Sequence, residues 1–400
     1  MRVLVIHNRY RSAAPSGENR VVDQESEALA ARGHDVERFE YHSDDIDGWP
    51  AARKATLPAR VVWNPAARRD LAATLRRFAP DVAHVHNTFP LLTPAVLHAC
   101  RDARVPVVAT LHNYKLLCAS GDFFRAGAVC HDCAGGSLAP ALRHRCYRGS
   151  AAATAPIIVG NVVHRRAWRE LVSAYVFISA EQRRLMAGLR ISPERAFVKP
   201  NFVPYAPLPD VPTRRQVAYV GRLDAAKGVP LLLAGWDRYR ADAGDGALRL
   251  VVAGDGPLGD EVRRWAADRP SVEVLGHLTR AECRDTLAAS RAALLPSQWE
   301  ETFGLVVVEA MAAGVPAVAA AHGSFPELVT EGRDGVLFRP GDADDLARAL
   351  HEVDRDPERL AAYGREARRT YERRFDVQAN VDQLLDIYEF AVRNPTRLAA

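Results

Sequence analysis

Lysine is scarce in this chain of 400 residues. Only four of its 53 basic residues are lysine, and the other 49 are arginine. A coding genome rich in G and C produces such a bias, so an arginine by itself is a weak sign of function here. The lysines are rarer choices, and their positions carry more information; they are Lys54, Lys115, Lys199 and Lys227.

The chain also lacks a hydrophobic run that is long enough to cross a bilayer. The longest stretch without Asp, Glu, Lys, Arg or His, 149–163, has 15 residues and contains a proline, whereas a membrane-spanning helix needs about 20. The apolar run in residues 1–10 is too short for a signal peptide and is typical of a β-strand. We therefore expect a soluble, cytoplasmic protein, whose six cysteines are free thiols or metal ligands instead of disulfides.

Neither sign of charge dominates the whole chain, but the charge is unevenly distributed. The formal net charge is +4, with +10 in residues 1–200 and −6 in residues 201–400. This asymmetry predicts two domains, of which the first meets something anionic. The composition, 48% hydrophobic and 26% charged, is typical of a globular protein.

Short β-branched runs alternate with helical stretches along most of the chain. Most of these runs are continuously apolar, as in strands that are covered on both faces. The alternation predicts an α/β protein with two doubly wound, Rossmann-like domains, residues 1–200 and 201–375, joined by a proline-containing linker at 200–212. A helix within 376–400 is expected to pack back on the first domain. The predicted strands are 2–7, 35–41, 81–86, 106–112, 173–179, 216–221, 248–254, 272–276, 292–296, 316–320 and 335–338.

The strongest motif lies at residues 296–313, PSQWEETFGLVVVEAMAA. A turn at Phe303 and Gly304 leads into a predicted helix, whose first free backbone N–H groups form an anion site. Glu309 follows about 7.5 Å along that helix, roughly the offset of a ribose from its phosphate. Glu301 precedes the helix and is placed to reach the other side of a diphosphate. Two solvent-facing acids are the alternative, which the partner motifs disfavour.

Two partner motifs end strands of the same domain. Residues 219–228, YVGRLDAAKG, place the cations Arg222 and Lys227 at the carboxyl edge of a parallel sheet, where ligands bind. Both side chains are suited to hold a departing diphosphate. The turns around Gly254 and His277 are tight enough for a nucleobase to lie against the backbone.

Taken in order, these motifs resemble those of the retaining nucleotide-sugar glycosyltransferases of family 4, which have the GT-B fold. The matching segments are G-R-L-x3-K-G, A-G-D-G-P, L-G-H-L, E-x7-E with F-G-L, and E-A-M-A-A-G-V-P-A-V. The resemblance implies transfer of a sugar, from a donor such as a UDP or GDP sugar, to a hydroxyl acceptor. That acceptor would be a glycan, a glycolipid precursor or a small molecule, as in bacterial polysaccharide biosynthesis.

The resemblance also implies roles for single residues of the second half. Arg222 and Lys227 would bind the diphosphate together with the backbone N–H groups of Gly304 and Leu305. The ribose hydroxyls would be bound by Glu309, and the transferred sugar by Glu301. Further donor contacts are expected at Gly254, His277 and Phe303.

In the first half the resemblance points to a glycine loop and a histidine. The loop is P-S-G-E-N at residues 15–19, where Gly17 would let the backbone approach the donor phosphate or the acceptor. Many members have two adjacent glycines there, and Ser16 replaces one of them. His112, at the end of the fourth predicted strand, matches the active-site histidine near the donor sugar. The strand-end pairs His7-Asn8 and His86-Asn87 are candidates for the same rim.

The implied mechanism is metal-independent transfer with retention, by front-face attack in which the leaving phosphate is the base. The chain has three Asp-x-Asp matches that a metal-dependent enzyme would need, but none lies beside the predicted site motifs; one, at Asp342, is predicted to cap a helix. Alternatives are a GT-B epimerase, which should lack the E-x7-E pairing, and a phosphorylase, which should have a late lysine. A zinc-stabilised scaffold without activity leaves the motifs unexplained.

Two further features keep two interpretations each. Residues 114–150 form an insert in which four cysteines are either free thiols or a structural zinc site: Cys118, Cys130, Cys133 and Cys146. Residues 64–80 put Leu71, Leu75 and Phe78 on one face of a basic helix. That helix is either solvated or docks at the inner face of the cell membrane, where a lipid-linked acceptor would be found. No nucleic-acid module is recognised.

Overall fold

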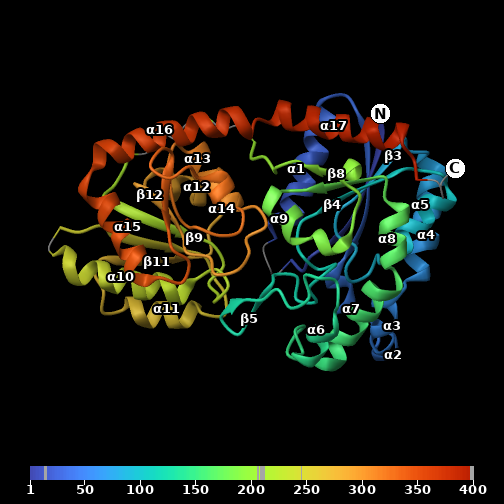
Figure 1. Ribbon diagram of the computed structural model, residues 1–400, viewed down its shortest axis with the longest axis horizontal. Coiled ribbons are helices and arrows are strands. Elements are labelled where there is room, and N and C mark those ends of the chain that lie inside the picture. The colour runs from blue at the N-terminus through green and yellow to red at the C-terminus, as the bar shows by residue number, and fades with distance from the viewer. Residues whose placement is uncertain (13–15, 205–206, 208–211, 245, 397–400) are drawn as a thin grey trace. The chain divides into compact units, whose positions relative to one another are not determined.

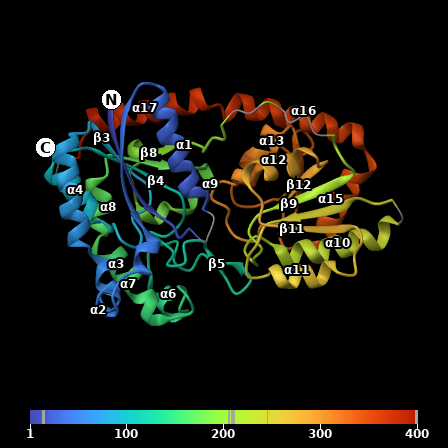
Figure 2. The ribbon, with the colours of Figure 1, turned by 180° about the vertical axis from the view of Figure 1, so that it is seen from behind.

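The computed structural model describes residues 1–12, 16–204, 207, 212–244 and 246–396. Two six-stranded parallel sheets dominate it, each flanked by helices (Figures 1 and 2). The predicted pair of doubly wound domains is confirmed. The first unit contains Met1–Phe123, Cys130–Asn201 and Val377–Ala400, and the second contains Phe124–Val129 and Phe202–Asp376. Six of the 13 residues of the linker predicted at 200–212 lie outside the described residues.

The first sheet has the strand order β2-β1-β3-β4-β7-β8. Its central strands β3, β4 and β7 are buried along their whole length, because helices cover both faces. The order reverses between β1 and β3, which pair from Val3 with Val82 to Ile6 with Val85. The strands are β1 (Arg2–Arg9), β2 (Asp35–His42), β3 (Val82–Val85), β4 (Val107–Leu111), β7 (Ala174–Phe177) and β8 (Ala196–Val198).

The second sheet has the order β11-β10-β9-β12-β13-β14, and its reversal lies between β9 and β12. The edge strand β11 alternates between more and less exposed residues, as expected of a strand that is covered less completely. The strands are β9 (Gln216–Val220), β10 (Arg249–Ala253), β11 (Val272–Gly276), β12 (Ala292–Leu295), β13 (Ala317–Ala320) and β14 (Gly335–Phe338).

Helices of the first unit begin at residues that suit helix N-termini. Ser16, Asn64, Ser150 and Ser179 each accept a backbone N–H with their side chain, which satisfies one orphan donor of the first turn. The helices are α1 (Gly17–Ala31), α2 (Ala51–Ala55), α3 (Leu57–Val62), α4 (Pro65–Phe78), α5 (Ala95–Asp102), α6 (Ala139–Arg143), α7 (Ala151–Val163), α8 (Arg165–Leu171), α9 (Ala180–Leu185) and α17 (Val377–Arg393), with 3₁₀ turns at Ser43–Ile46, Ala187–Leu189 and Pro193–Arg195.

In the second unit Asp342 caps α15 by accepting the backbone N–H groups of Asp344 and Asp345, so its predicted capping role is confirmed. Helices α10 and α15 pack together against one face of the sheet. The helices are α10 (Val229–Ala243), α11 (Gly259–Ala266), α12 (Arg280–Ala288), α13 (Leu305–Ala312), α14 (Phe325–Leu328), α15 (Ala343–Arg355) and α16 (Pro357–Arg374).

The C-terminal helix α17 packs on the first sheet, beside α1 (Figure 1). Val381, Leu384 and Tyr388 are at most 1% exposed, and they contact a layer that includes Val3 and Val108. Each buried apolar side chain of this size contributes about 1.5–3 kcal/mol. The chain therefore returns to the first unit after it completes the second.

Three short strands were not predicted. β8 has only three residues, and β5 (Phe124–Arg125) and β6 (Ala128–Val129) form a hairpin of two residues each. Runs of this length carry no measurable periodicity. Among the described residues, no helix is both long and apolar enough to span a bilayer.

Candidate active site

In the second unit the predicted donor residues gather at the carboxyl ends of the strands. The loop after β9 carries Lys227, and the loop after β12 carries Glu301. Because β9 and β12 are neighbours at the reversal of strand order, their loops diverge there and leave the crevice in which ligands of doubly wound sheets bind.

Lys227 and Glu301 form an ion pair across this reversal. The Lys227 ammonium lies 2.9 Å from each carboxylate oxygen and 4.8 Å from the centre of the Trp299 ring. Trp299 Nε1 and Ser297 Oγ also donate to Glu301 Oε2, at 2.7 and 3.2 Å. The family resemblance implied that Lys227 binds the diphosphate of the donor and that Glu301 binds its sugar. In the structure the two side chains bind each other.

At the N-terminus of α13, the Gly304 cap position has no side-chain hydrogen bond to the first turn. Gly304 has φ +90°, and a Cβ there would lie 2.7 Å from Cε1 of Phe325, so only glycine fits. The helix begins at Leu305, one turn before the half-buried Glu309. Phe303 differs from the prediction as a donor contact: its side chain is 3% exposed and packs edge-on against Phe375, which leaves only its backbone for a ligand.

The remaining predicted donor residues lie on adjacent strand ends. The Arg222 side chain is 59% exposed and pairs with Asp224 at 3.1 Å. Gly254 has φ +140°, and a Cβ there would lie 1.8 Å from the carbonyl oxygen of Gly221, so the turns after β9 and β10 are in backbone contact. His277 is exposed and directly follows β11.

In the first unit, histidines occupy the corresponding edge. His7 lies two residues before the end of β1 at Arg9, His86 follows β3, and His112 follows β4. The β1–β3 register ends at Ile6 with Val85, which makes His7 and His86 neighbours. The rings of His86 and His112 stack with centroids 5.1 Å apart, and His86 Nδ1 lies 2.8 Å from His112 Nε2.

These histidines are in surroundings that oppose protonation. Burial lowers the pKa of His7 to about 4, although hydrogen bonding to Asn19 acts against this. Burial, together with the neighbouring histidines and Lys199, lowers the pKa of His86 and of His112 well below 6.5. They are therefore neutral near pH 7.

A cavity of about 70 Å³ lies beside His112 in the first unit. His86 and Asn87 line it, whereas His7 and Asn8 are fully buried and do not. The Asn8 side chain instead accepts the backbone N–H of Leu91 at 2.9 Å, which holds the loop after β3. His7 and Asn8 therefore have a structural role and do not line the cavity.

Two cavity residues, Glu18 and Lys115, were not among the predicted site residues. Tyr10 and Asn113 donate to Glu18 Oε2 at 2.9 and 3.3 Å, yet burial raises the pKa of Glu18 to about 7. Burial lowers the pKa of Lys115 to about 8, and its ammonium lies 4.5 Å from the centre of the Phe89 ring. The rarity of lysine was a signal for Lys115; Glu18 had only its place beside Gly17.

The glycine loop itself is only partly described. Pro15 lies outside the described residues, Ser16 caps α1, and Gly17 is the first residue of that helix and is exposed. Ser16 Oγ accepts the backbone N–H of Asn19 at 3.3 Å. The departure from two adjacent glycines therefore supplies a helix cap.

Comparison with known proteins matches both halves of the chain. The model of Glycosyltransferase Family 4 matches residues 15–206, and that of Glycosyl transferases group 1 matches residues 207–370. The chain belongs to glycosyltransferase family 4. Its GT-B fold agrees with Anabaena HepE in complex with UDP and glucose, which has a TM-score of 0.69 at 19% identity, over 97% of this chain and 99% of that one.

Curated relatives of this glycosyltransferase act on different substrates. Glycogen synthase of Mycobacterium tuberculosis is 28% identical over 427 aligned positions, covering 98% of this chain and 95% of that protein. A D-inositol 3-phosphate glycosyltransferase of Corynebacterium kroppenstedtii is 34% identical over 186 positions, 44% of this chain and 41% of its own length. The family and the glycosyl-transfer activity are thus shared, while the compounds in the relatives' names differ.

The cysteine insert of the glycosyltransferase gathers its thiols around Cys133. Burial, to which the nearby thiols Cys118, Cys146 and Cys130 add, raises the pKa of Cys133 to about 11. Among the described residues, however, no three cysteine sulfurs lie within 4.8 Å of one another. Zinc binding stays a prediction, which the zinc content of the purified protein checks.

The basic helix predicted at 64–80 is α4. Its apolar residues Leu71, Leu75 and Phe78 belong to the core, and Arg77 binds Glu37 through both of its terminal nitrogens. The apolar face expected to dock on a membrane is therefore covered by the glycosyltransferase itself.

Proposed function

We propose that this glycosyltransferase moves a sugar, with retention and without a metal ion, from a nucleoside diphosphate to a hydroxyl acceptor. The Lys227–Glu301 ion pair at the β9–β12 reversal carries the proposal, because it holds a cation on the loop that leads from β12 into α13. The complexes of HepE with UDP and with UDP-glucose support a nucleotide sugar as donor.

Stabilisation of the leaving group is the main catalytic contribution in this proposal. Cleavage of the sugar–phosphate bond builds negative charge on the diphosphate, and preorganised donors stabilise that charge most. Lys227, Arg222 and the N–H groups at the start of α13 supply these donors. Glu301 orients Lys227 before the donor arrives and then shares it, which leaves a carboxylate oxygen for the sugar hydroxyls. Glu309 takes the ribose.

Retention follows from front-face attack, with the leaving phosphate as the base. Glu301 already accepts from Lys227, Trp299 and Ser297, and these bonds make it a poor nucleophile. The Asp-x-Asp matches serve elsewhere in the fold: Asp47 pairs with Arg11, and Asp354 binds Arg215 and Tyr239. Activity that survives EDTA and an α-configured product from an α-configured donor are the expected results.

On the acceptor side, we assign the cavity beside His112 to the reacting groups. His112 faces the transferred sugar, and Glu18, held through one oxygen by Tyr10 and Asn113, offers its other oxygen to the acceptor hydroxyl. Among the residues that line this cavity, Lys115 is the cation, which suits an acceptor with an anionic group nearby.

If the acceptor is lipid-linked, α6 and α7 are the membrane contact in our proposal, in place of α4. Leu142, Val159, Val162 and Val163 are 43–61% exposed, and Arg143 and Arg166 beside them are exposed. Apolar side chains with basic neighbours suit an anionic bilayer. Val162→Asp should weaken sedimentation with phosphatidylglycerol vesicles, whereas Val392→Asp on α17 should not; equal loss would contradict this surface.

Donor binding is the experiment that tests the central proposal. The protein is heated with UDP-, GDP-, ADP- or dTDP-glucose, and one donor should raise the unfolding temperature, since a ligand stabilises the state that it binds. Glu301→Gln should lower sugar transfer from that donor about 10²–10³-fold. Glu261→Gln, an exposed acid on α11, is the matched control. Undiminished transfer in Glu301→Gln would refute the site.

A further inference from the structure

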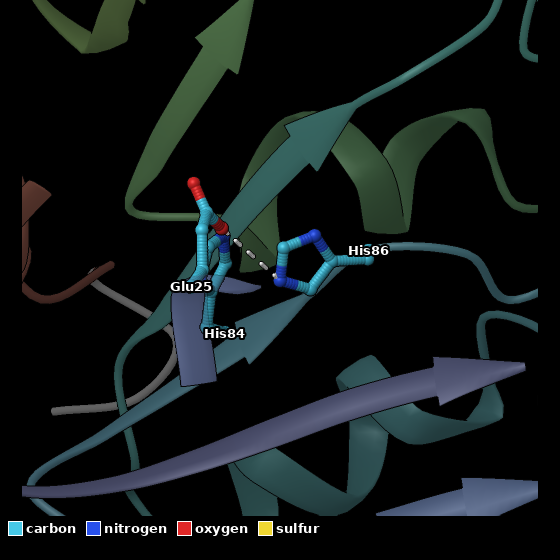
Figure 3. A group of neighbouring side chains, drawn as sticks. All are labelled: Glu25, His84 and His86. Atoms are coloured by element: carbon cyan, nitrogen blue, oxygen red, sulfur yellow. Dashed lines mark ion pairs between the residues drawn. The ribbon is translucent and has the colours of Figure 1, made fainter. Parts of the chain in front are cut away.

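A buried acid lies behind the histidine edge of the first unit. Glu25 projects from α1 toward His84 and His86 (Figure 3), and its Oε1 accepts from Lys199 at 2.7 Å. Lys199 also donates to Asn380 Oδ1 on α17 at 2.7 Å. Glu25 Oε2 and His86 Nε2 are both buried without a hydrogen-bond partner and lie 3.8 Å apart.

The residue types of this cluster are those of a metal site, but its bonding is not. Both nitrogens of His84 are occupied, Nδ1 by the Tyr388 hydroxyl and Nε2 by Thr110 Oγ1, each at 2.7 Å. The Lys199 ammonium already neutralises the carboxylate and would repel a second cation. A metal ion would find two ligand atoms here instead of the three or four that it needs.

Glu25 therefore influences the tautomer of His86, and does not hold a metal ion. A neutral imidazole carries one proton, on either ring nitrogen, and the groups around it decide which. The carboxylate at 3.8 Å favours the proton on Nε2 of His86. Nδ1 of His86 is then a bare acceptor, and it lies 2.8 Å from His112 Nε2, which must donate. Because the single proton of neutral His112 is then on Nε2, its other ring nitrogen, Nδ1, carries no proton and can accept a hydrogen bond.

We propose that Glu25 sets the tautomer of His112 through His86, so that His112 presents a hydrogen-bond acceptor at the cavity. Glu25 and His86 are positioning residues. The group that His112 recognises must be a donor such as a hydroxyl, because a bare nitrogen repels phosphate and carboxylate oxygens. That this hydroxyl belongs to the transferred sugar rests on the proposed function; the tautomer itself does not.

The substitution Glu25→Gln should reverse the chain of protons. Lys199 still requires an acceptor, so the introduced amide turns its oxygen toward Lys199 and its N–H groups toward His86 Nε2. His86 must then carry its proton on Nδ1 and donate to His112 Nε2, which moves the His112 proton to Nδ1. His112 loses its acceptor, and kcat should fall about 10- to 100-fold.

The test is nitrogen NMR of the full-length protein labelled with ¹⁵N-histidine, in which protonated and bare ring nitrogens have distinct shifts. A spectrum of His112→Asn assigns the His112 signals. Wild-type protein should show His112 protonated at Nε2 and bare at Nδ1, and Glu25→Gln should show the reverse. Glu27→Gln, an exposed acid on the same helix, should change neither the tautomer nor kcat.

Several results would overturn the inference. If His112 of the wild type is protonated at Nδ1, the inference is overturned by the wild-type spectrum alone. The test therefore still works if Glu25→Gln fails to fold. The inference is also overturned if folded Glu25→Gln keeps the wild-type tautomer of His112. It is overturned as well if the wild type contains one equivalent of metal that Glu25→Gln loses. The predicted tautomer in a protein that transfers no sugar would instead refute the proposed function alone.

Discussion

The two sheets have the same architecture but opposite chemistry at their carboxyl edges. The first places neutral histidines there, His7, His86 and His112, next to a cavity with one lysine. The second places the charged residues Arg222 and Lys227 there, both partly exposed. The doubly wound fold thus determines where a ligand binds, and the strand-end residues determine which chemical group it must bring.

Net charge gives a misleading picture of this division. The first half of the chain carries +10 and the second −6, yet the cations suited to a diphosphate are in the second. Many arginines of the first half are engaged in ion pairs, such as Arg9 with Asp23 and Glu40. Charge on a site is therefore decided by a few side chains, not by the balance of the domain.

A fall in pH should give the largest difference in stability between the two units, because it destabilises the first more than the second. His7 and His84 have a pKa of about 4 in the folded state, lowered by burial, against 6.5 when unfolded. The unfolded chain therefore binds protons first as pH falls, and stability that is complete above pH 6.5 is lost toward pH 4. At pH 5 each histidine costs about 2 kcal/mol. Hydrogen exchange should show β1 and β3 opening before β9 and β12.

The variants His84→Gln and His277→Asn sharpen this prediction. Glutamine can still bond to Tyr388 and Thr110 but does not titrate, so His84→Gln should reduce the acid sensitivity of the first unit. His277 is exposed, and its replacement should change nothing. Equal opening of both sheets at pH 5 would show that the histidine edge does not control acid stability.

Lysine replacement should separate the units by activity. Lys227→Ala removes a cation from the leaving diphosphate and should lower kcat/KM about 10²–10³-fold, measured with the donor that thermal shift identifies. Lys54→Ala removes an exposed lysine of the first unit, which donates to the Asp47 carbonyl, and should leave kcat/KM unchanged. Equal effects would refute the role of Lys227.

Glycine replacement should give a smaller effect. Gly254→Ala forces a Cβ to within 1.8 Å of the Gly221 carbonyl oxygen at φ +140°, and should lower the free energy of unfolding by about 1–3 kcal/mol. Gly135→Ala in the first unit meets nothing within 4 Å and should stay within about 0.5 kcal/mol. Urea titration measures both; similar losses would contradict the close backbone approach.

Exposed arginines should differ least. Arg76→Ala on α4 should change stability by less than about 0.5 kcal/mol and leave transfer unaffected, since Arg76 is exposed. Arg222→Ala should weaken donor binding about 10-fold, the value of one charge-assisted hydrogen bond. Calorimetric titration measures the affinity of both variants for the donor. If Arg76→Ala lost as much affinity as Arg222→Ala, the donor could not be assigned to the edge of the second sheet.

Much of the fold was predictable, because strands buried on both faces require continuous apolar runs. The donor loop was predictable for a similar local reason: Gly304 must be glycine to begin α13 with positive φ. The buried network was not. Lys199 was notable only as a rare lysine, and its partner Glu25 lies 174 positions away, beyond the reach of any spacing argument.

The sequence by itself determined the order of the elements, the strand-end loops and the kinds of groups that those loops carry. Tertiary structure decided which groups meet: Lys227 with Glu301, Glu25 with Lys199, His86 with His112, and the apolar face of α4 with the core. The reason is physical. Backbone preference and hydrophobic pattern act over a few residues, whereas desolvation and hydrogen bonding act between atoms that only folding brings together.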